Sequence, residues 1–531
     1  MTTELRPFQQ DVKSEIISAW QSGHRNVMAV LPTGSGKTVM FSNIIAEYPG
    51  ASVAIAHRQE IVTQISLALA RNEVRHRIIG PAEVARVCTT LHLNDTGRNY
   101  IDPSNRVAVA GVDTLIRMEP NAWFNSVGLI VQDECHHLLK ANKWGKAHAM
   151  FPNAFGLGVT ATAIRADGKG LGDSSDGVMH KMIVGPNMRD LIEQGWLTEY
   201  RIFAPPSDLD LRDVPLSASG DFSPVPLSKA VHKSHIVGDI VAHYKRIASG
   251  KLGITFAVDV AAAVEIAKAY RDAGVPSEVV SAKTPDLLRQ SILRRFAKRE
   301  VMQLVNVDLF GEGFDLPAIE VVSMARPTQS YSLFAQQFGR SLRPMEGKSH
   351  AIIIDHVGNV HRHGLPDAPR TWSLERREKS ARSLAKGVLP VRTCPECAGV
   401  YEAYLKSCPF CGHIILYSGR SSPAEVDGDL CELSPEVLAQ LRGQIDTPPT
   451  FPYSAAPEVI GAIKKRHREK TEAQAALRYA ISQWAGNNTQ RTDAASIAEL
   501  QRKFFHTFGI DVLSAQALGR QDAEELTRRI K

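Results

Sequence analysis

The chain has 531 residues, of which 44% are hydrophobic and 22% charged, and its formal net charge is +6 at pH 7. This composition is typical of a globular protein with about three or four domains and excludes a largely disordered chain. No apolar run reaches the about 18 residues that a membrane span needs, and the first residues lack the pattern of a secretory signal. We therefore expect a cytoplasmic protein without a membrane partner.

Before residue 372, short apolar runs alternate with longer helical patterns. The runs are rich in Val, Ile, Leu and Ala and have polar, Gly or Pro residues at their ends, which is typical of buried parallel strands joined by crossover helices. Because the pattern restarts after about residue 200, the sequence predicts an α/β fold with two tandem parallel-sheet domains. The expected strands lie at 26–31, 52–56, 107–110, 129–132 and 156–159, then at 252–258, 278–280, 302–307, 320–325 and 351–355.

The segments between and after the two predicted sheet domains differ in composition from the strand and helix patterns. Residues 204–226 are rich in Pro, Ser and Asp and indicate an irregular connection between the two sheet domains. Residues 374–386 are basic and indicate a helix or linker, 417–457 indicate a second linker, and 458–531 show a helical pattern without strand-like runs. The predicted segments are 1–185, 186–372, 373–390, 391–416, 417–457 and 458–531.

A loop of small residues, Leu31–Thr38, separates an expected strand from an expected helix. That context fits a phosphate-binding loop, because small residues let backbone N–H groups wrap phosphates and the helix N-terminus adds positive potential. The general pattern has a Gly where Leu31 stands, so the alternative is a simple turn beside a surface lysine. Lys37 is expected to reach the β- and γ-phosphates and Thr38 to hold Mg²⁺. The residues expected to line the nucleotide are Thr33, Gly34, Ser35, Gly36, Lys37 and Thr38.

Two carboxylates, Asp133 and Glu134, follow the expected strand at 129–132. A hydrolytic site needs one carboxylate to hold Mg²⁺ and another to orient and deprotonate the attacking water. Asp133 fits the first role and Glu134 the second. An acidic pair that caps the next helix is the alternative, and the phosphate-type loop upstream favours the hydrolytic interpretation.

Four of the seven cysteines form two Cys-x-x-Cys pairs, Cys394 with Cys397 and Cys408 with Cys411. Four thiolates on two short turns suit a closed tetrahedral Zn²⁺ site, and in a reducing compartment such spacing favours metal over disulfides. Metal binding would supply much of the folding energy of so small a ribbon. The alternative is two unrelated or redox-active pairs.

These features resemble, in the same order, the motifs of superfamily 2 helicases. Leu31–Thr38 resembles motif I, and Asp133–His136 is a DExH variant of motif II. The resemblance covers the chain up to about residue 370 and implies two RecA-like domains with an ATPase site between them. The other matching segments are Leu5–Gln9, which resembles the adenine-recognition element, and Ala56–Glu60, Gly111–Thr114, Thr160–Thr162, Asn306–Pro317 and Gln336–Arg343, which resemble motifs Ia, Ib, III, V and VI.

The resemblance also implies roles for single residues. Gln9 is expected to recognise adenine, and Gly313 and Asp315 of motif V to contribute to the nucleotide site. Nucleic-acid contacts are expected, by motif position alone, at three residues: Arg58, Thr114 and Thr160.

Arg340 and Arg343 stand three residues apart, which places them on one face of an expected helix. The resemblance implies that these arginines, with Gln336, reach the γ-phosphate from the second domain. An arginine at that place stabilises the charge of the transition state. A salt bridge on a helix surface is the alternative.

We expect the protein to be an ATP-dependent DNA helicase or translocase in repair, recombination or replication. Its motif II differs from the Asp-Glu-Ala-Asp of DEAD-box RNA helicases, and its motif VI resembles those of restriction-enzyme motor subunits, XPB-type helicases and bacterial or phage RadD-type proteins. Phosphate contacts would give little sequence preference. The C-terminal region is expected to bind DNA or a repair or replication protein; its basic run, 464–470, is a solvated helix face or a phosphate-binding strip. The alternatives are an RNA helicase, and a recruitment factor that uses ATP only as a switch.

Overall fold

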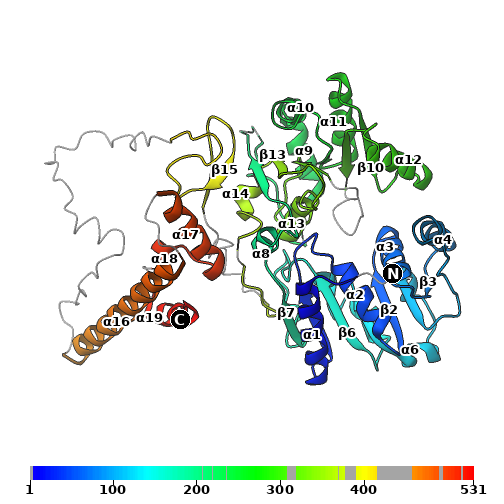
Figure 1. The fold of residues 1–531 in the computed structure, drawn as a ribbon, viewed down its shortest axis with the longest axis horizontal. Coiled ribbons are helices and arrows are strands. Elements are labelled where there is room, and N and C mark those ends of the chain that lie inside the picture. Colours follow the sequence, from blue (N-terminus) through cyan, green and yellow to red (C-terminus); the bar gives the residue numbers. More distant parts are fainter. Residues whose placement is uncertain are drawn as a thin grey trace. The chain divides into compact units, whose positions relative to one another are not determined.

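A computed structural model of the chain describes residues 4–205, 207, 209–217, 219–234, 236–307, 319–368, 370–376, 390–414, 457–488, 494–515 and 518–530. These residues form two large parallel sheets with their helices, a two-stranded ribbon and a group of C-terminal helices (Figure 1). The predicted α/β fold with two tandem parallel-sheet domains is confirmed. No helix in the described parts of the chain is long and apolar enough to cross a membrane.

The first domain contains a parallel sheet with the strand order β3-β4-β2-β5-β6-β1-β7. Its central strands are buried along nearly their whole length, as expected for Val-, Ile- and Ala-rich parallel strands. The strands are β1 Asn26–Val30, β2 Ala51–Ala56, β3 Arg77–Ile79, β4 Val107–Gly111, β5 Val127–Gln132, β6 Phe155–Thr160 and β7 Lys181–Val184. The helices are α1 Pro7–Gln21, α2 Lys37–Glu47, α3 Gln59–Arg71, α4 Ala82–Thr96, α5 Val112–Leu115, α6 Ala122–Ser126 and α7 Lys143–Ala149, with a 3₁₀ turn at Cys135–His137.

The second domain contains a parallel sheet with the order β10-β11-β9-β12-β13-β8, so the strand that enters the domain first forms its edge. The strands are β8 Tyr200–Phe203, β9 Gly253–Phe256, β10 Ser277–Ser281, β11 Gln303–Val307, β12 Val321–Met324 and β13 Ala351–Asp355. The helices are α8 Met188–Glu193, which precedes β8, then α9 Pro224–Lys233, α10 Ile236–Ile247, α11 Val260–Asp272, α12 Asp286–Ala297, α13 Tyr331–Gly339 and α14 Asn359–His363.

Among the described strands of the two parallel sheets, β3, β7 and β8 are absent from the sequence prediction, and all three are edge strands. Each has three or four residues and is only partly buried. Because an edge strand pairs on one side only, its residues do not need the continuous apolar run that marks a central parallel strand. The signal on which the prediction relied is therefore missing from these segments.

The helix that carries the motif VI residues is shorter than predicted. Helix α13 ends at Gly339, Arg340 is its C-cap, and Arg343 lies beyond the helix. The prediction that the two arginines share a helix face is therefore wrong. Two local features account for the early end: Gly339 is a weak helix former, and the residue before Pro344, which is Arg343, is disfavoured in the helical conformation.

The chain that follows the second sheet returns to the first domain. Leu171 donates a backbone hydrogen bond to the carbonyl oxygen of Leu374, at 2.7 Å, and the guanidinium of Arg376 pairs with Asp176 at 2.5 Å. Trp372 and Leu374 pack against the apolar core of the first domain. The predicted boundary at residue 372 therefore falls inside a segment that docks on the first domain.

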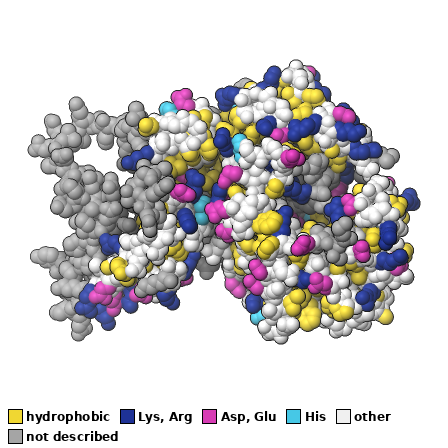
Figure 2. Space-filling model, viewed as in Figure 1, with side chains coloured by type: hydrophobic (Ala, Val, Ile, Leu, Met, Phe, Trp, Pro, Cys, Tyr) yellow, Lys and Arg dark blue, Asp and Glu magenta, His cyan; other side chains and the backbone are white. Residues whose placement is uncertain are grey.

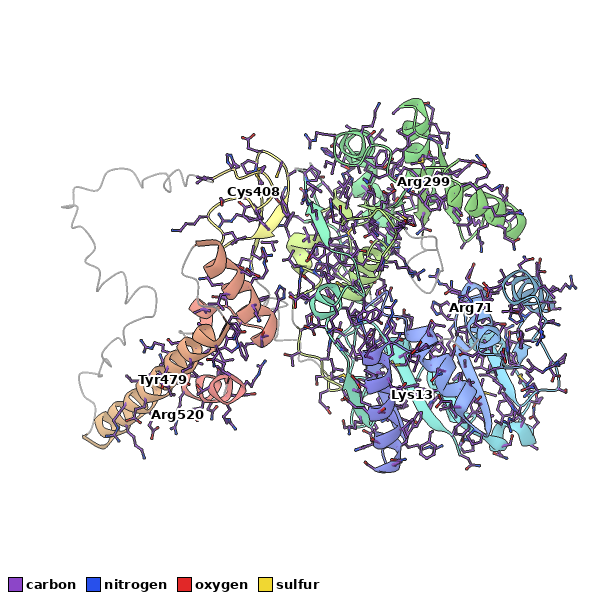
Figure 3. The ribbon with its side chains drawn as sticks, in the orientation of Figure 1. Lys13, Arg71, Arg299, Cys408, Tyr479 and Arg520 are labelled. Atoms are coloured by element: carbon purple, nitrogen blue, oxygen red, sulfur yellow. The ribbon has the colours of Figure 1, made fainter. Side chains whose placement is uncertain are left out.

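The C-terminal helices have a core of their own. They are α16 Pro457–Asn488, α17 Ala494–Phe508, α18 Val512–Ala515 and α19 Arg520–Ile530. Arg520 of α19 pairs with Glu469 of α16 at 2.5 Å (Figure 3). Most of the predicted basic segment and nearly all of the second linker, at 377–389 and 415–456, lie outside the described residues. The buried core residues are Ala473, Leu477, Ile481, Phe504, Phe508, Ala515, Ala523 and Leu526.

Candidate functional site

The loop between β1 and α2 has the backbone shape of a phosphate cradle. Gly34 and Gly36 have positive φ angles of 88° and 85°, a region that glycine enters without strain. A Cβ atom on Gly36 would lie 2.5 Å from Nε2 of Gln9, and one on Gly34 would lie 3.0 Å from Cδ2 of Leu197. The conformation therefore favours glycine at both positions, and a Cβ atom would fit only if the side chain of Gln9 or Leu197 moved.

Helix α1 braces this loop and the helix that follows it. Nε2 of Gln9 donates hydrogen bonds to the carbonyl oxygens of Ser35, at 2.8 Å, and Gly36, at 3.2 Å. Lys13, also on α1, pairs with Glu47 at the end of α2 at 2.6 Å (Figure 3). The structure thus places Gln9 against the phosphate-type loop, and its role in adenine recognition stays a prediction.

Lys37 begins α2, and its half-buried side chain lies against the loop. Its Nζ lies 3.2 Å from the carbonyl oxygen of Leu31. Burial lowers the pKa of Lys37, the negative charges of Glu134 and Asp133 oppose this shift, and the charge of Arg340 adds to it. The ammonium group therefore lies in the field of both carboxylates of the first domain and of an arginine of the second.

Asp133 and Glu134 lie at the carboxyl end of β5 and are 7% and 6% exposed. Glu134 has a φ of +48°, and its backbone N–H donates to Oδ1 of Asp133 at 2.9 Å. A left-handed conformation is uncommon for a residue other than glycine and is enriched at functional sites. Oε2 of Glu134 lies 3.3 Å from Nδ1 of His136.

A chain of polar contacts leads from Glu134 toward the second domain. Nδ1 of His136 lies 3.0 Å from Oγ1 of Thr160, which donates to the carbonyl oxygen of Thr162 at 3.0 Å. Oγ1 of Thr162 lies 2.6 Å from Oγ of Ser332 on α13. Thr160 is fully buried in this network, so its expected contact with nucleic acid stays a prediction.

The motif VI segment lies directly against the phosphate-type loop. A Cβ atom on Gly339 would lie 2.5 Å from Cβ of Thr33, so only glycine allows this approach. Arg340, the next residue, is 9% exposed, whereas Arg343 is half-buried. Gln336, also on α13, is buried, and both of its amide atoms lack a hydrogen-bond partner within the described part of the chain.

The residues present fit a nucleoside triphosphate and Mg²⁺. Besides the Gln336 amide, the buried hydroxyls of Thr33 and Ser35 have no hydrogen-bond partner among the residues that the structure describes. Buried polar groups are normally paired, so these atoms indicate space for a polar ligand. Thr38 and Asp133 supply the oxygen ligands that Mg²⁺ prefers.

Two residues expected to contact nucleic acid, Arg58 and Thr114, lie at the carboxyl ends of strands in the first sheet. Arg58 follows β2 as the N-cap of α3, and Thr114 follows β4 on α5. Strands β2 and β4 are parallel neighbours, with Ala56 paired with Gly111, so both residues lie near the carboxyl ends of adjacent strands. The expected motif V residues, Gly313 and Asp315, lie outside the described residues.

The four clustered cysteines lie together in the ribbon formed by β14, Val391–Thr393, and β15, Val400–Glu402. The four sulfur atoms lie within 4.8 Å of one another, and those of Cys394 and Cys411 are 3.6 Å apart. Zn–S bonds of about 2.3 Å in a tetrahedron separate the sulfurs by about 3.8 Å, so the cluster fits Zn²⁺. Cys394 and Cys408 are almost fully buried, and Figure 3 marks the place of Cys408 in the ribbon.

Replacing Cys394 and Cys397 with Ser should release the zinc, about one ion per chain, because a closed site with two thiolates cannot hold it tightly. Metal analysis of the purified protein checks this, with Cys88→Ala, at a buried cysteine outside the cluster, as the control. Basal ATPase activity should persist, because no cysteine of the ribbon lies in the phosphate-type loop or motif VI. Wild-type protein without stoichiometric zinc would contradict the assignment.

A phosphate-type loop and an acidic pair in one parallel-sheet domain, faced by an arginine of a second, define a two-domain nucleotide hydrolase. Residues 2–165 match the family model of the type III restriction enzyme res subunit, and residues 233–345 match that of the helicase conserved C-terminal domain. The chain belongs to the superfamily 2 helicases of the restriction-subunit and XPB type, which are nucleic-acid-dependent ATPases that use ATP and Mg²⁺.

Three relatives illustrate the range of this similarity. A 51.5 kDa protein of a Lactococcus phage is 32% identical over 75% of this chain and 80% of its own length. IRC3 of Saccharomyces cerevisiae, named as an ATP-dependent helicase, is 32% identical over 67% of this chain but only 51% of its own length. A Sulfurisphaera tokodaii protein named DNA 3'-5' translocase XPB2 is 24% identical over 67% of this chain and 81% of its own length.

Proposed function

We propose that this protein is an ATP-dependent DNA helicase or translocase that hydrolyses ATP between its two sheet domains. The proposal rests on one arrangement: the phosphate-type loop and the acidic pair of the first domain lie next to the motif VI segment of the second domain. Lys37 and the pair Asp133 and Glu134 come from the first domain, and Gly339, the residue before Arg340 of the second domain, packs directly on Thr33 of the phosphate-type loop. Such a split site joins hydrolysis to the relative movement of two domains.

Each group has a distinct chemical task in the proposal. Lys37 and the loop amides bind the phosphates, and Thr38 with Asp133 holds Mg²⁺, which neutralises charge on the phosphate oxygens. Glu134 orients the attacking water and accepts its proton, and Arg340 stabilises negative charge in the transition state. The chain of contacts through His136 and Thr160 gives the second domain a physical link to Glu134.

Several observations support DNA as the partner. One relative is named a DNA translocase, and the chain carries a net charge of +6. Lys and Arg side chains gather over α12 (Figure 2), where Arg294, Arg295 and Lys298 are exposed. Exposed cations bind phosphates without reading sequence, as a motor that steps along any strand requires. Repair, recombination or replication is the proposed setting, with the C-terminal region as the site for a further protein.

The experiment that tests the proposal is steady-state ATPase activity of the full chain, titrated with single-stranded, duplex and forked DNA and with RNA of equal length. We expect several-fold stimulation by DNA of any sequence, and stimulation that weakens steeply as salt is raised. Stimulation by RNA alone would identify an RNA helicase instead. A strong preference for one base sequence at fixed salt would contradict the phosphate-contact account.

A further inference from the structure

The segment that follows the second sheet domain, residues 372–376, is seated closely on the first domain, and we call it the return segment. A carboxylate oxygen of Glu375 accepts a hydrogen bond from Oγ of Ser174 at 2.9 Å, in addition to the backbone hydrogen bonds that Leu374 accepts. A Cβ atom on Gly170 would lie 2.8 Å from the carbonyl oxygen of Leu374. Because that oxygen belongs to the backbone, a side chain on Gly170 would have to displace the return segment.

Trp372, the first residue of the return segment, contacts both sheet domains. Its half-buried side chain packs against the apolar core of the first domain. The centroid of its ring lies 6.3 Å from that of Tyr331, at an interplanar angle of 39°, and Tyr331 is the first residue of α13 in the second domain. Tyr331 is itself held firmly, because it is 7% exposed and its hydroxyl donates to the carbonyl oxygen of Pro366 at 3.0 Å. Trp372 therefore bridges the two domains at the start of α13.

The other end of α13 carries the motif VI residues. Gly339, the last residue of the helix, packs on Thr33 of the phosphate-type loop, and Arg340 is the C-cap. At the start of the helix, Oγ of Ser332 donates to the carbonyl oxygen of Ile164 in the first domain at 3.1 Å. Because a helix of nine residues moves as one piece, contacts at its start restrict where Arg340 can lie at its end.

We propose that Trp372 is a positioning residue that holds α13, and with it Arg340, against the first domain. The inference rests on the proposed ATPase function and adds to it how the arginine is kept in place. Any movement that separates α13 from the first domain must break one of the two contacts of Trp372. Since a contact made in only one of two arrangements shifts the equilibrium toward that arrangement, Trp372 favours the closed cleft. Arg340 meets the phosphate, and Trp372 acts through α13.

The test compares the kinetic constants of full-length Trp372→Ala with those of the wild type. We expect kcat to fall about three- to tenfold, the loss of one aromatic contact between the domains, while the KM for ATP changes less than about twofold. The KM should hold because Lys37 and the phosphate-type loop belong to the first domain. Trp372→Phe should restore most of kcat, since it keeps a ring for Tyr331. In an Arg340→Ala background, Trp372→Ala should change the single-turnover rate less than about twofold, because no arginine is left to position.

Trp123 offers a matched control, because it is also half-buried against the core of the first domain and its ring neighbours, Phe124 and Phe151, belong to that domain. Trp123→Ala should have the kcat of the wild type. The inference is overturned if Trp372→Ala keeps the wild-type kcat, if its KM rises as much as its kcat falls, or if it slows the reaction equally with and without Arg340. Arg340→Ala with the wild-type kcat would instead refute the role of this arginine in the proposed function, and the inference with it.

Discussion

Glu134→Gln should reduce ATP turnover by about 10²- to 10⁴-fold and leave ATP binding nearly intact, since it removes only the general base. The amide keeps the size of the side chain and its place at the end of β5, where Glu134 is 6% exposed. Lys37→Ala should differ by weakening nucleotide binding as well, because a direct phosphate contact is lost. Measurement of kcat together with the equilibrium dissociation constant of ATP separates these two outcomes.

Glu119→Gln is a suitable control for this pair, because Glu119 is an exposed carboxylate of the same domain, between α5 and α6. It should have the kinetic constants of the wild type. Near-normal turnover by Glu134→Gln would show that another group accepts the proton of the attacking water, and the assignment of the base would be wrong.

Arg340→Ala should bind ATP but lose about 10³- to 10⁵-fold in kcat, the contribution of an arginine that stabilises transition-state charge. Arg343→Ala should have a smaller effect, because Arg343 lies beyond the end of α13 and is half-buried. Arg340 is buried and follows Gly339, which packs on the phosphate-type loop. Arg340→Lys should not restore full activity, since a lysine lacks the planar fork of donors.

Single-turnover measurements with saturating ATP check this second expectation, because they report the chemical step without product release. Equal losses of kcat for Arg340→Ala and Arg343→Ala would contradict the assignment of transition-state stabilisation to Arg340 alone. Loss of ATP binding in Arg340→Ala would place the arginine in ground-state binding rather than in the transition state.

The sequence is informative about the sheets because a central parallel strand must be apolar along its whole length. Runs such as 26–31 and 351–355 therefore predicted β1 and β13 closely. The edge strands β3, β7 and β8 escaped prediction because half their surface is not in the core. The predicted end of α13 was also wrong, although Gly339 and Pro344, which both disfavour continuation of a helix, are visible in the sequence.

For the candidate site, too, local sequence patterns predicted some residues, and other contacts could be found only in the structure. The local motifs gave Lys37, Asp133 and Glu134, because each stands at the junction of a strand with a loop or helix. The contact of Thr162 with Ser332 and the docking of residues 372–376 were missed, because they join segments far apart in the sequence and have no periodic pattern. His136 stood within a recognised motif, and only the structure shows its contacts with Glu134 and Thr160.

Strand displacement tests whether ATP hydrolysis by this protein drives movement on DNA. Release of one labelled strand from a forked duplex reports unwinding. Release of a labelled third strand from a triplex on plain duplex DNA reports translocation. We predict that the wild type displaces at least one of these strands with ATP and Mg²⁺, and that neither Glu134→Gln nor wild type with a non-hydrolysable ATP analogue does so. ATP-dependent DNA binding without displacement of either strand would contradict the account and identify an ATP-switched recruitment factor.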